Sequence, residues 1–254
     1  MIIHIPRRHR LLISVNAPSH YEVADVTRKG RAAYASKCDA DYIEILDDAH
    51  PKWGMANKWR IARFAEGYYQ TCYMDGDVIV KPDAPNIFEA GPSYTIMFRD
   101  ELPTVKANAA GDYVQRLSQW AKIFRCQKAP TFSPNAGVMV IPQNMINLYH
   151  PPEKDVKEDW CLDQYYLACR LVNEGLTDKI TFLSEEYHLM YIQQDFWEKL
   201  PECKIIHLNG SQNGPYRLEL AKRIEADNFD FFMPDSKKVW LPPWRKLREI
   251  RKNK

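Results

Sequence analysis

Two acidic residues, Asp75 and Asp77, stand one residue apart directly after an apolar run, and a second apolar run follows at once. Residues 71–80 therefore predict a buried strand that ends in two carboxylates, followed at once by a second buried strand. Such carboxylates are costly unless a cation meets them, and in an extended segment residues i and i+2 point the same way. Gly76 between them leaves room for a ligand close to the backbone. The pair is predicted to bind Mn²⁺ or Mg²⁺, with a diphosphate completing the coordination shell.

Other polar residues suit the same chemistry, and each also has a purely structural explanation. His207 ends an apolar run and is either a third metal ligand or a histidine bonded to a backbone carbonyl. Lys58 lies either over the phosphates or on a solvated helix face. Asn135 either approaches a ligand or makes a turn. Asp163 and Gln164 sit in an otherwise apolar helix, where they need partners that sugar hydroxyls would supply.

The elements that position these residues alternate between strands and helices up to residue 80. Apolar patterns predict strands at residues 11–15, 42–46 and 71–80, with helices at 21–37 and 53–68 between them. This order implies a parallel sheet with right-handed crossovers, and such a sheet places ligands outside the carboxyl ends of its strands. Further elements are predicted beyond this unit: strands at 94–98, 137–141, 180–183 and 204–207, and helices at 111–124, 158–173 and 216–227.

The composition of the 254 residues is that of an ordinary globular protein. No window approaches the roughly 20 apolar residues of a membrane span, and the first ten residues lack the apolar core of a secretory signal. A cytoplasmic location is predicted. The cysteines show no C-x-x-C pair, which favours reduced, buried thiols over a zinc site. They are Cys38, Cys72, Cys126, Cys161, Cys169 and Cys203.

The charge is unevenly distributed along the chain. Residues 237–254 hold eight basic residues and one acidic residue, a net charge of +7, which leaves −5 for residues 1–236. We therefore divide the chain into a domain at 1–236 and a basic tail at 237–254. Within the tail, Trp244, Leu247 and Ile250 lie three residues apart with basic residues between them. The tail is predicted to dock by this apolar stripe, or to bind an anionic membrane surface or nucleic acid.

The motifs taken together and in order resemble a known fold. They are Lys58, Asp75-Gly76-Asp77, Asn135-Ala136-Gly137-Val138-Met139-Val140, Asp163-Gln164 and His207-Leu208-Asn209-Gly210. This set resembles the A-type fold of nucleotide-sugar glycosyltransferases, and within it the retaining group that includes glycogenin and bacterial lipooligosaccharide galactosyltransferases. The resemblance covers about residues 10–217 and is far more specific than any single motif. It implies a single Rossmann-like α/β domain with a mostly parallel central sheet flanked by helices.

The resemblance also implies a role for each candidate residue. Asp75, Asp77 and His207 would hold the metal, usually Mn²⁺, with Asp75 also near the ribose. Asp163 and Gln164 would lie at the reacting face, one on the donor sugar and one near its anomeric carbon. The remaining candidates would contact the donor: Asn16 and Tyr21 the base, Lys58 the phosphate or sugar, and Asn135 the sugar. The family's phosphate-binding lysine after the histidine motif is missing here, and Arg217 is the candidate replacement.

The implied reaction is transfer of a sugar from a nucleoside diphosphate sugar to a hydroxyl with retention of configuration. A UDP-sugar is the first choice of donor. The acceptor would be a glycan, a glycolipid or a hydroxymethylated base in DNA. One alternative is a non-catalytic protein of the same fold that only binds sugar nucleotides or glycans. A less favoured alternative is a haloacid dehalogenase-type phosphatase, which normally carries its Asp-x-Asp on the first strand.

Overall fold

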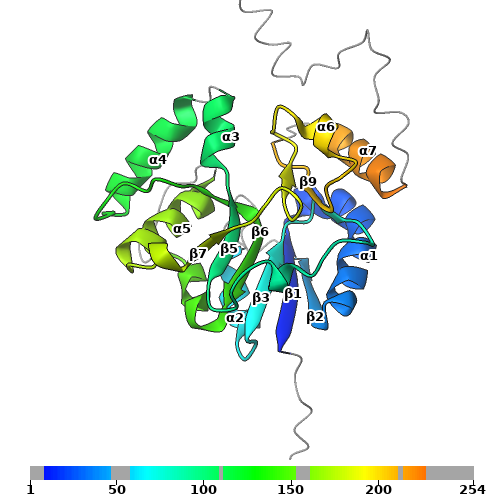
Figure 1. Ribbon diagram of the computed structural model, residues 1–254, viewed down its shortest axis with the longest axis horizontal. Helices are drawn as coiled ribbons and strands as arrows, with labels where there is room; N and C mark the ends of the chain where they lie inside the picture. The colour runs from blue at the N-terminus through cyan, green and yellow to red at the C-terminus, as the bar shows by residue number, and fades with distance from the viewer. Residues whose placement is uncertain (1–8, 47–57, 109–110, 153–160, 211–213, 227–254) are drawn as a thin grey trace, which may run out of the picture.

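The central feature is a six-stranded sheet with the strand order β2-β1-β3-β6-β5-β7 (Figure 1). The computed structural model of the chain describes residues 9–46, 58–108, 111–152, 161–210 and 214–226. The strands of the sheet are β1 (Arg10–Asn16), β2 (Ala40–Leu46), β3 (Gln70–Met74), β5 (Ile96–Asp100), β6 (Pro134–Pro142) and β7 (Ile180–Phe182). Among these described strands, β6 runs antiparallel to its two neighbours and the other pairings are parallel. The predicted mostly parallel sheet is confirmed.

A second, three-stranded sheet with the order β4-β9-β8 packs beside the first. Its strands are β4 (Val78–Val80), β8 (Leu189–Met190) and β9 (Ile205–His207). The chain passes from the large sheet to the small one between β3 and β4, so the Asp75-Gly76-Asp77 segment is the link between them. Val78 at the start of β4 pairs with His207 at the end of β9. This register brings the predicted histidine to the predicted carboxylates.

Helices cover both faces of the large sheet. They are α1 (Tyr21–Lys37), α2 (Ile61–Ala65), α3 (Leu102–Ala107), α4 (Gly111–Ile123), α5 (Leu162–Asn173), α6 (Phe196–Lys199) and α7 (Gly214–Glu225). Short 3₁₀ helices occur at Pro18–His20, Ile87–Glu89, Gln143–Tyr149 and Thr177–Lys179. Helix α1 packs against β4 and α7, whereas α5 packs against β6 and α4. In Figure 1, α6 and α7 lie near β9 on the same side as α1.

Side-chain alternation along the central strands explains why both faces are covered. In β1, Leu11 and Ile13 join the apolar cluster under α2, α4 and α5, while Leu12 joins the cluster under α1. In β3, Tyr73 joins the first of these clusters and Cys72 joins the second. Because successive side chains of a strand point to opposite faces, a strand that is apolar at every position needs helices on both sides. A third cluster holds the small sheet against α6 and α7.

Some boundaries differ from the sequence-based predictions. The helix predicted over 53–68 is α-helical only at Ile61–Ala65, and its first residues, 53–57, lie outside the described part of the chain. It ends early because Gly67 adopts a left-handed conformation with φ of 86°, which turns the chain toward β3. The predicted tail at 237–254 and the start of the helix predicted at 158–173 also lie outside the described residues. Within the described residues, no helix has the length and apolar character needed to cross a membrane.

Candidate functional site

The candidate residues converge because several strands of the large sheet end at one edge. Asn16 is the last residue of β1, Asp75 follows β3 directly, and Glu101 follows β5 directly. Those three strands share one direction, and β6 runs the other way, so the amino end of β6 with Asn135 reaches the same edge. Parallel strands gather their carboxyl ends at one edge, where α/β proteins bind ligands. The site predicted from the sequence is therefore at the expected edge.

The two aspartates lie in a turn and not in the extended segment that we predicted. The Val78 amide donates a 3.1 Å hydrogen bond to the Asp75 carbonyl, which closes the turn. The turn still presents both carboxylates to one side, because His207 Nε2 lies 3.5 Å from Asp75 and 3.3 Å from Asp77. One ligand atom from each of the three residues lies within 4.8 Å of the other two. Two carboxylate oxygens and one imidazole nitrogen suit a divalent metal such as Mn²⁺.

Two side chains of helix α1 hold the turn by binding the backbone carbonyl of Gly76. Thr27 Oγ1 lies 2.6 Å from the Gly76 carbonyl oxygen, and Arg31 Nη1 donates to the same oxygen at 2.9 Å. Both side chains are fully buried, and Arg31 is also paired with Glu44 at 3.0 Å. A Cβ at Gly76 would fall 2.0 Å from Asn16 Oδ1. Only glycine fits there, so the turn is fixed by packing as well as by hydrogen bonds.

Lys58 is buried at the centre of the site. Its Nζ lies 3.2 Å from Asp75 and 3.0 Å from Asp163 Oδ2, and it donates to the Ala136 carbonyl at 3.2 Å. Burial opposes the charge, but the carboxylates of Asp163 and Asp75 outweigh it and raise the pKa of Lys58. Lys58 is thus a permanent cation that joins the aspartate turn to helix α5. The solvated-helix explanation is wrong for this residue.

Asp77 is paired with both His207 and Arg217. Arg217 Nη1 on α7 lies 2.9 Å from Asp77 Oδ2, and the Asp77 side chain is almost fully buried. Burial alone would raise the pKa of Asp77, but His207 and Arg217 hold it well below its usual range. Arg217, the candidate replacement for the missing lysine, thus lies against the aspartates. A cation in this position could also contact an anionic ligand of the bound metal.

The buried Glu101 organises a second group of candidates. Its Oε2 accepts hydrogen bonds from Gln164 Nε2 at 2.7 Å and from Asn135 Nδ2 at 3.0 Å. Gln164 Nε2 also donates to the Tyr113 hydroxyl at 2.9 Å, so both of its protons are used. Burial raises the pKa of Glu101, while the bonds from Gln164 and Asn135 act against that shift. These contacts set which end of the Gln164 amide is the carbonyl oxygen.

Asp163 keeps unused hydrogen-bonding capacity. Its carboxylate is 3% exposed and ion-paired with Lys58, yet its Oδ1 has no hydrogen-bond partner among the described residues. A buried carboxylate oxygen without a donor is costly, and a ligand hydroxyl would satisfy it. Tyr21 is different: it begins α1 half-buried, and within the described part of the chain no hydrogen bond links its hydroxyl to the other candidates.

Sequence reasoning missed His188, which precedes β8 and is completely buried. Its Nε2 lies 3.1 Å from His207 Nδ1. The two-residue strand β8 is too short to give a periodic pattern, so nothing in the sequence indicated where His188 would lie. Glu101 was also missed. The strand was predicted to end at residue 98, whereas β5 runs to Asp100, so Glu101 follows its strand directly, as Asp75 follows β3.

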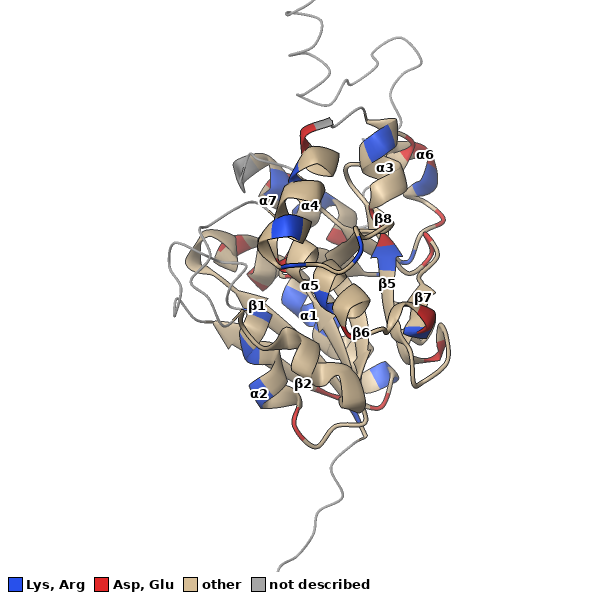
Figure 2. Ribbon diagram, turned by 90° about the vertical axis from the view of Figure 1, so that its left-hand side faces the viewer, with Lys and Arg blue, Asp and Glu red and all other residues tan. Residues whose placement is uncertain are grey.

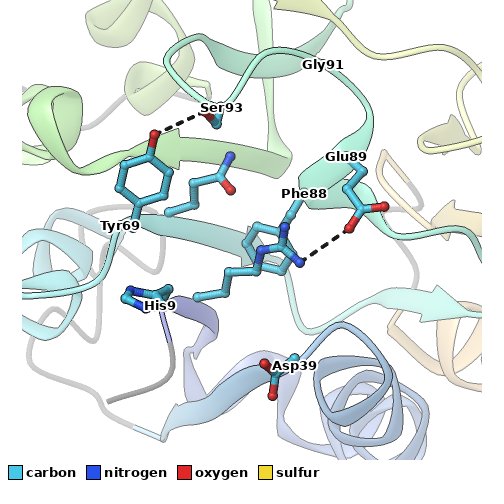
Figure 3. Close-up of a pocket in the computed structure, with 9 residues that line it drawn as sticks. His9, Asp39, Tyr69, Phe88, Glu89, Gly91 and Ser93 are labelled. Atoms are coloured by element: carbon cyan, nitrogen blue, oxygen red, sulfur yellow. Dashed lines mark hydrogen bonds and ion pairs between the residues drawn. The ribbon is translucent and has the colours of Figure 1, made fainter. Parts of the chain in front are cut away.

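A separate hollow of about 600 Å³ lies at the other end of the large sheet (Figure 3). It is lined by Arg10 and Gln70, the first residues of β1 and β3, so it faces away from the aspartates. Tyr69 and Ser93 are hydrogen-bonded across its rim at 3.1 Å. Its place at the amino ends of parallel strands separates it from the candidate site.

Comparison with known proteins adds the fold family. No family model and no curated protein sequence matches the chain. Among solved structures, the chain is similar to a glycosyltransferase involved in the glycosylation of the major capsid of PBCV-1. That match has a TM-score of 0.52 at 13% identity and covers 84% of this chain and 98% of the other. The fold is that of the A-type glycosyltransferases.

Two further structures match in the same way. The bifunctional glycosyltransferase WbbM matches with a TM-score of 0.50 at 14% identity, and the match covers 100% of this chain but only 53% of WbbM. The galactosyltransferase LgtC, in complex with donor and acceptor sugar analogs, matches with a TM-score of 0.49 at 11% identity over 83% of this chain and 94% of LgtC. At these identities the likeness concerns the fold, and the argument for function rests on the site.

Proposed function

We propose that the protein is a metal-dependent glycosyltransferase that moves a sugar from a nucleoside diphosphate sugar to a hydroxyl with retention of configuration. The observation that carries this proposal is the cluster of Asp75, Asp77 and His207 at the carboxyl edge of an A-type glycosyltransferase sheet. The fold alone would not support an activity, because one fold hosts many functions. The cluster adds the chemistry that such a reaction needs.

The donor set fits a divalent metal. Two carboxylates and a histidine nitrogen come from separate elements and reach one point without a change of fold. Asp75 is held by the Tyr73 hydroxyl and by Lys58, so its orientation is fixed before a metal arrives. When bound, Mn²⁺ would act as a Lewis acid that stabilises the departing diphosphate. Asp75, Asp77 and His207 would hold it.

Several residues of this chain would then hold the donor. Arg217 and Lys58 are the cations nearest to the metal-binding carboxylates, and both suit the phosphates. Asp163 Oδ1 would accept a hydrogen bond from a donor-sugar hydroxyl, which would satisfy its open capacity. Asn16, whose Oδ1 is also buried without a partner among the described residues, would meet the nucleoside. A UDP-sugar is our first choice of donor.

Retention is supported by the position of Gln164. Glu101 and Tyr113 take both Nε2 protons, so the amide oxygen is the group left to face a substrate. An amide oxygen beside the anomeric carbon would stabilise positive charge there while the departing phosphate takes the acceptor proton. The aspartates among the described residues of the site are assigned to roles other than that of a nucleophile at the anomeric carbon. Asp75 and Asp77 would hold the metal, and Asp163 is paired with Lys58.

The test is release of nucleoside diphosphate from a panel of nucleotide sugars with Mn²⁺ present. Wild-type protein is expected to release it, and Asp77→Asn is expected to lower the rate by at least about 100-fold. Asp178→Asn is the matched control, because Asp178 is exposed and, in the part of the chain that the structure describes, its ion pair is with its neighbour Lys179. Equal turnover by wild type and Asp77→Asn would refute the metal-dependent mechanism.

The same assay separates the alternatives. A non-catalytic protein of this fold would bind the sugar nucleotide, as seen by calorimetry, without releasing diphosphate. A phosphatase would release inorganic phosphate from a phosphate ester. The structure disfavours a phosphatase because Asp75 follows β3, the third strand of the chain, and not the first.

The acceptor is proposed from charge. In Figure 2, basic and acidic residues are interspersed on the helices of the viewed side. In the sequence, residues 237–254 carry a net charge of +7, against −5 for residues 1–236. A glycolipid acceptor at a membrane surface predicts that the protein binds anionic vesicles, which would also place it at that surface. A hydroxymethylated DNA base predicts DNA affinity that falls steeply with salt. Deletion of residues 237–254 should abolish whichever binding is found.

A further inference from the structure

The two ring nitrogens of His207 face different partners. Nε2 faces the carboxylates, 3.3 Å from Asp77 and 3.5 Å from Asp75. Nδ1 faces the opposite way and lies 3.1 Å from His188 Nε2. Both histidines are buried, at 4% and 0% exposed. The position of the His207 ring is therefore set by these two contacts and by packing.

Strand pairing places the two imidazoles together. β8 and β9 are parallel neighbours, with Met190 opposite His207, and the Tyr191 amide donates to the His207 carbonyl at 2.9 Å. His188 lies directly before β8, and its ring is tilted by 31° from that of His207 with the centroids 5.3 Å apart. The pair is thus built from the backbone register of the small sheet and not from flexible side chains.

Packing in the core does not by itself explain a histidine at position 188. Its Nδ1 has no hydrogen-bond partner among the described residues, and a fully buried ring nitrogen without a partner is costly. An apolar side chain of similar size would fill the space without that cost. The hydrogen bond between the His188 side chain and His207 is the contact that explains a polar residue at this position.

We propose that His188 is a positioning residue that keeps His207 Nε2 directed at Asp75 and Asp77. This inference rests on the proposed function, because it takes His207 as a metal ligand. A neutral histidine that binds a metal through Nε2 carries its proton on Nδ1, and that N–H needs an acceptor. His188 Nε2 is the acceptor at hydrogen-bond distance. His188 would act through His207 and would not itself bind the metal.

The experiment compares His188→Leu, which has no acceptor, with His188→Gln, which keeps one. Mn²⁺ affinity is measured without nucleotide, by electron paramagnetic resonance of the free ion, on the full-length chain. We expect His188→Leu to bind Mn²⁺ about 10–100-fold more weakly, as for other lost partners of metal-bound histidines. His188→Gln should recover most of that loss. Pulsed resonance should show Mn²⁺–nitrogen coupling in wild type and His188→Gln, and less in His188→Leu.

Three results would overturn the inference. One is an unchanged Mn²⁺ affinity in folded His188→Leu. Another is an equal loss in both variants, which would show that packing and not the hydrogen bond is responsible. The third needs no variant: ¹⁵N NMR of the wild type with Mg²⁺ bound, showing the His207 proton on Nε2. If Asp77→Asn also leaves Mn²⁺ binding unchanged, the metal site itself fails, which distinguishes that failure from failure of the His188 role alone.

Discussion

Gly137 allows a test of the site geometry that does not depend on any ligand. It lies inside β6, and a Cβ added there would fall 2.0 Å from His207 Cε1 and 2.5 Å from its Nδ1. Its backbone is not in the left-handed region, so alanine is excluded by the imidazole and not by its own conformation. Gly137→Ala should therefore displace the His207 ring from its position in the site.

The expected cost follows from the distances. Carbon atoms in contact prefer a separation of about 3.5 Å, so the ring must withdraw by about 1.5 Å. His207 is buried and its ring is hydrogen-bonded to His188, and overpacking of this kind costs about 1–3 kcal/mol. Without the imidazole the clash disappears. Gly137→Ala in a His207→Ala background should then be stabilising, by about 0.4–1 kcal/mol, because alanine restricts the unfolded chain.

Urea unfolding of four proteins measures this double-mutant cycle: wild type, the two single variants and the double variant. The prediction is a reversal of sign, with Gly137→Ala destabilising only when His207 is present. The same variant should lose Mn²⁺ affinity. If Gly137→Ala changes the free energy of unfolding equally in both backgrounds, the two residues do not touch as described, and the reasoning is refuted.

Two more predictions concern buried charges. Lys58→Met should lower the free energy of unfolding by about 3–5 kcal/mol, because it leaves the buried carboxylate of Asp163 without its paired cation and removes a cation from Asp75. Adding Asp163→Asn should recover part of the loss in urea unfolding. The pKa of Glu101 is raised on folding, so its ionisation costs stability as pH rises above about 4.3, its unfolded value. Glu101→Gln should therefore gain stability relative to wild type as pH rises through that window, and a difference independent of pH would contradict the shift.

The sequence predicted the central part of the fold because that part follows period-two and period-3.6 patterns. Helix α1 was predicted at its observed bounds, Tyr21–Lys37, and both ends of β1 and the start of β3 were predicted within one residue. Asp75 was placed correctly at a sheet edge because carboxyl ends of parallel strands meet there. Each of these inferences depends on local pattern or on a general rule of chain topology.

The parts that were not predicted depend on contacts between distant segments. The small sheet uses strands of two or three residues, which are too short to show a period, and it alone brings His188 to His207. The aspartate segment was expected to be extended, but the change from one sheet to the other makes it a turn. Thr27 and Arg31 support that turn from a helix some 45 residues earlier, and no local pattern marks them.

The charges of the site explain how it could bind a cation and then an anion. Three carboxylates, those of Asp75, Asp77 and Asp163, face two permanent cations, Lys58 and Arg217, which leaves one excess negative charge. A divalent ion reverses the sign of that excess, and the metal-loaded site then attracts a diphosphate. Under the proposed function, Lys58 and Arg217 would therefore have two roles: they make two buried aspartates tolerable in the free protein, and they would stay in place as partners for the donor. This balance favours binding of the metal before the donor.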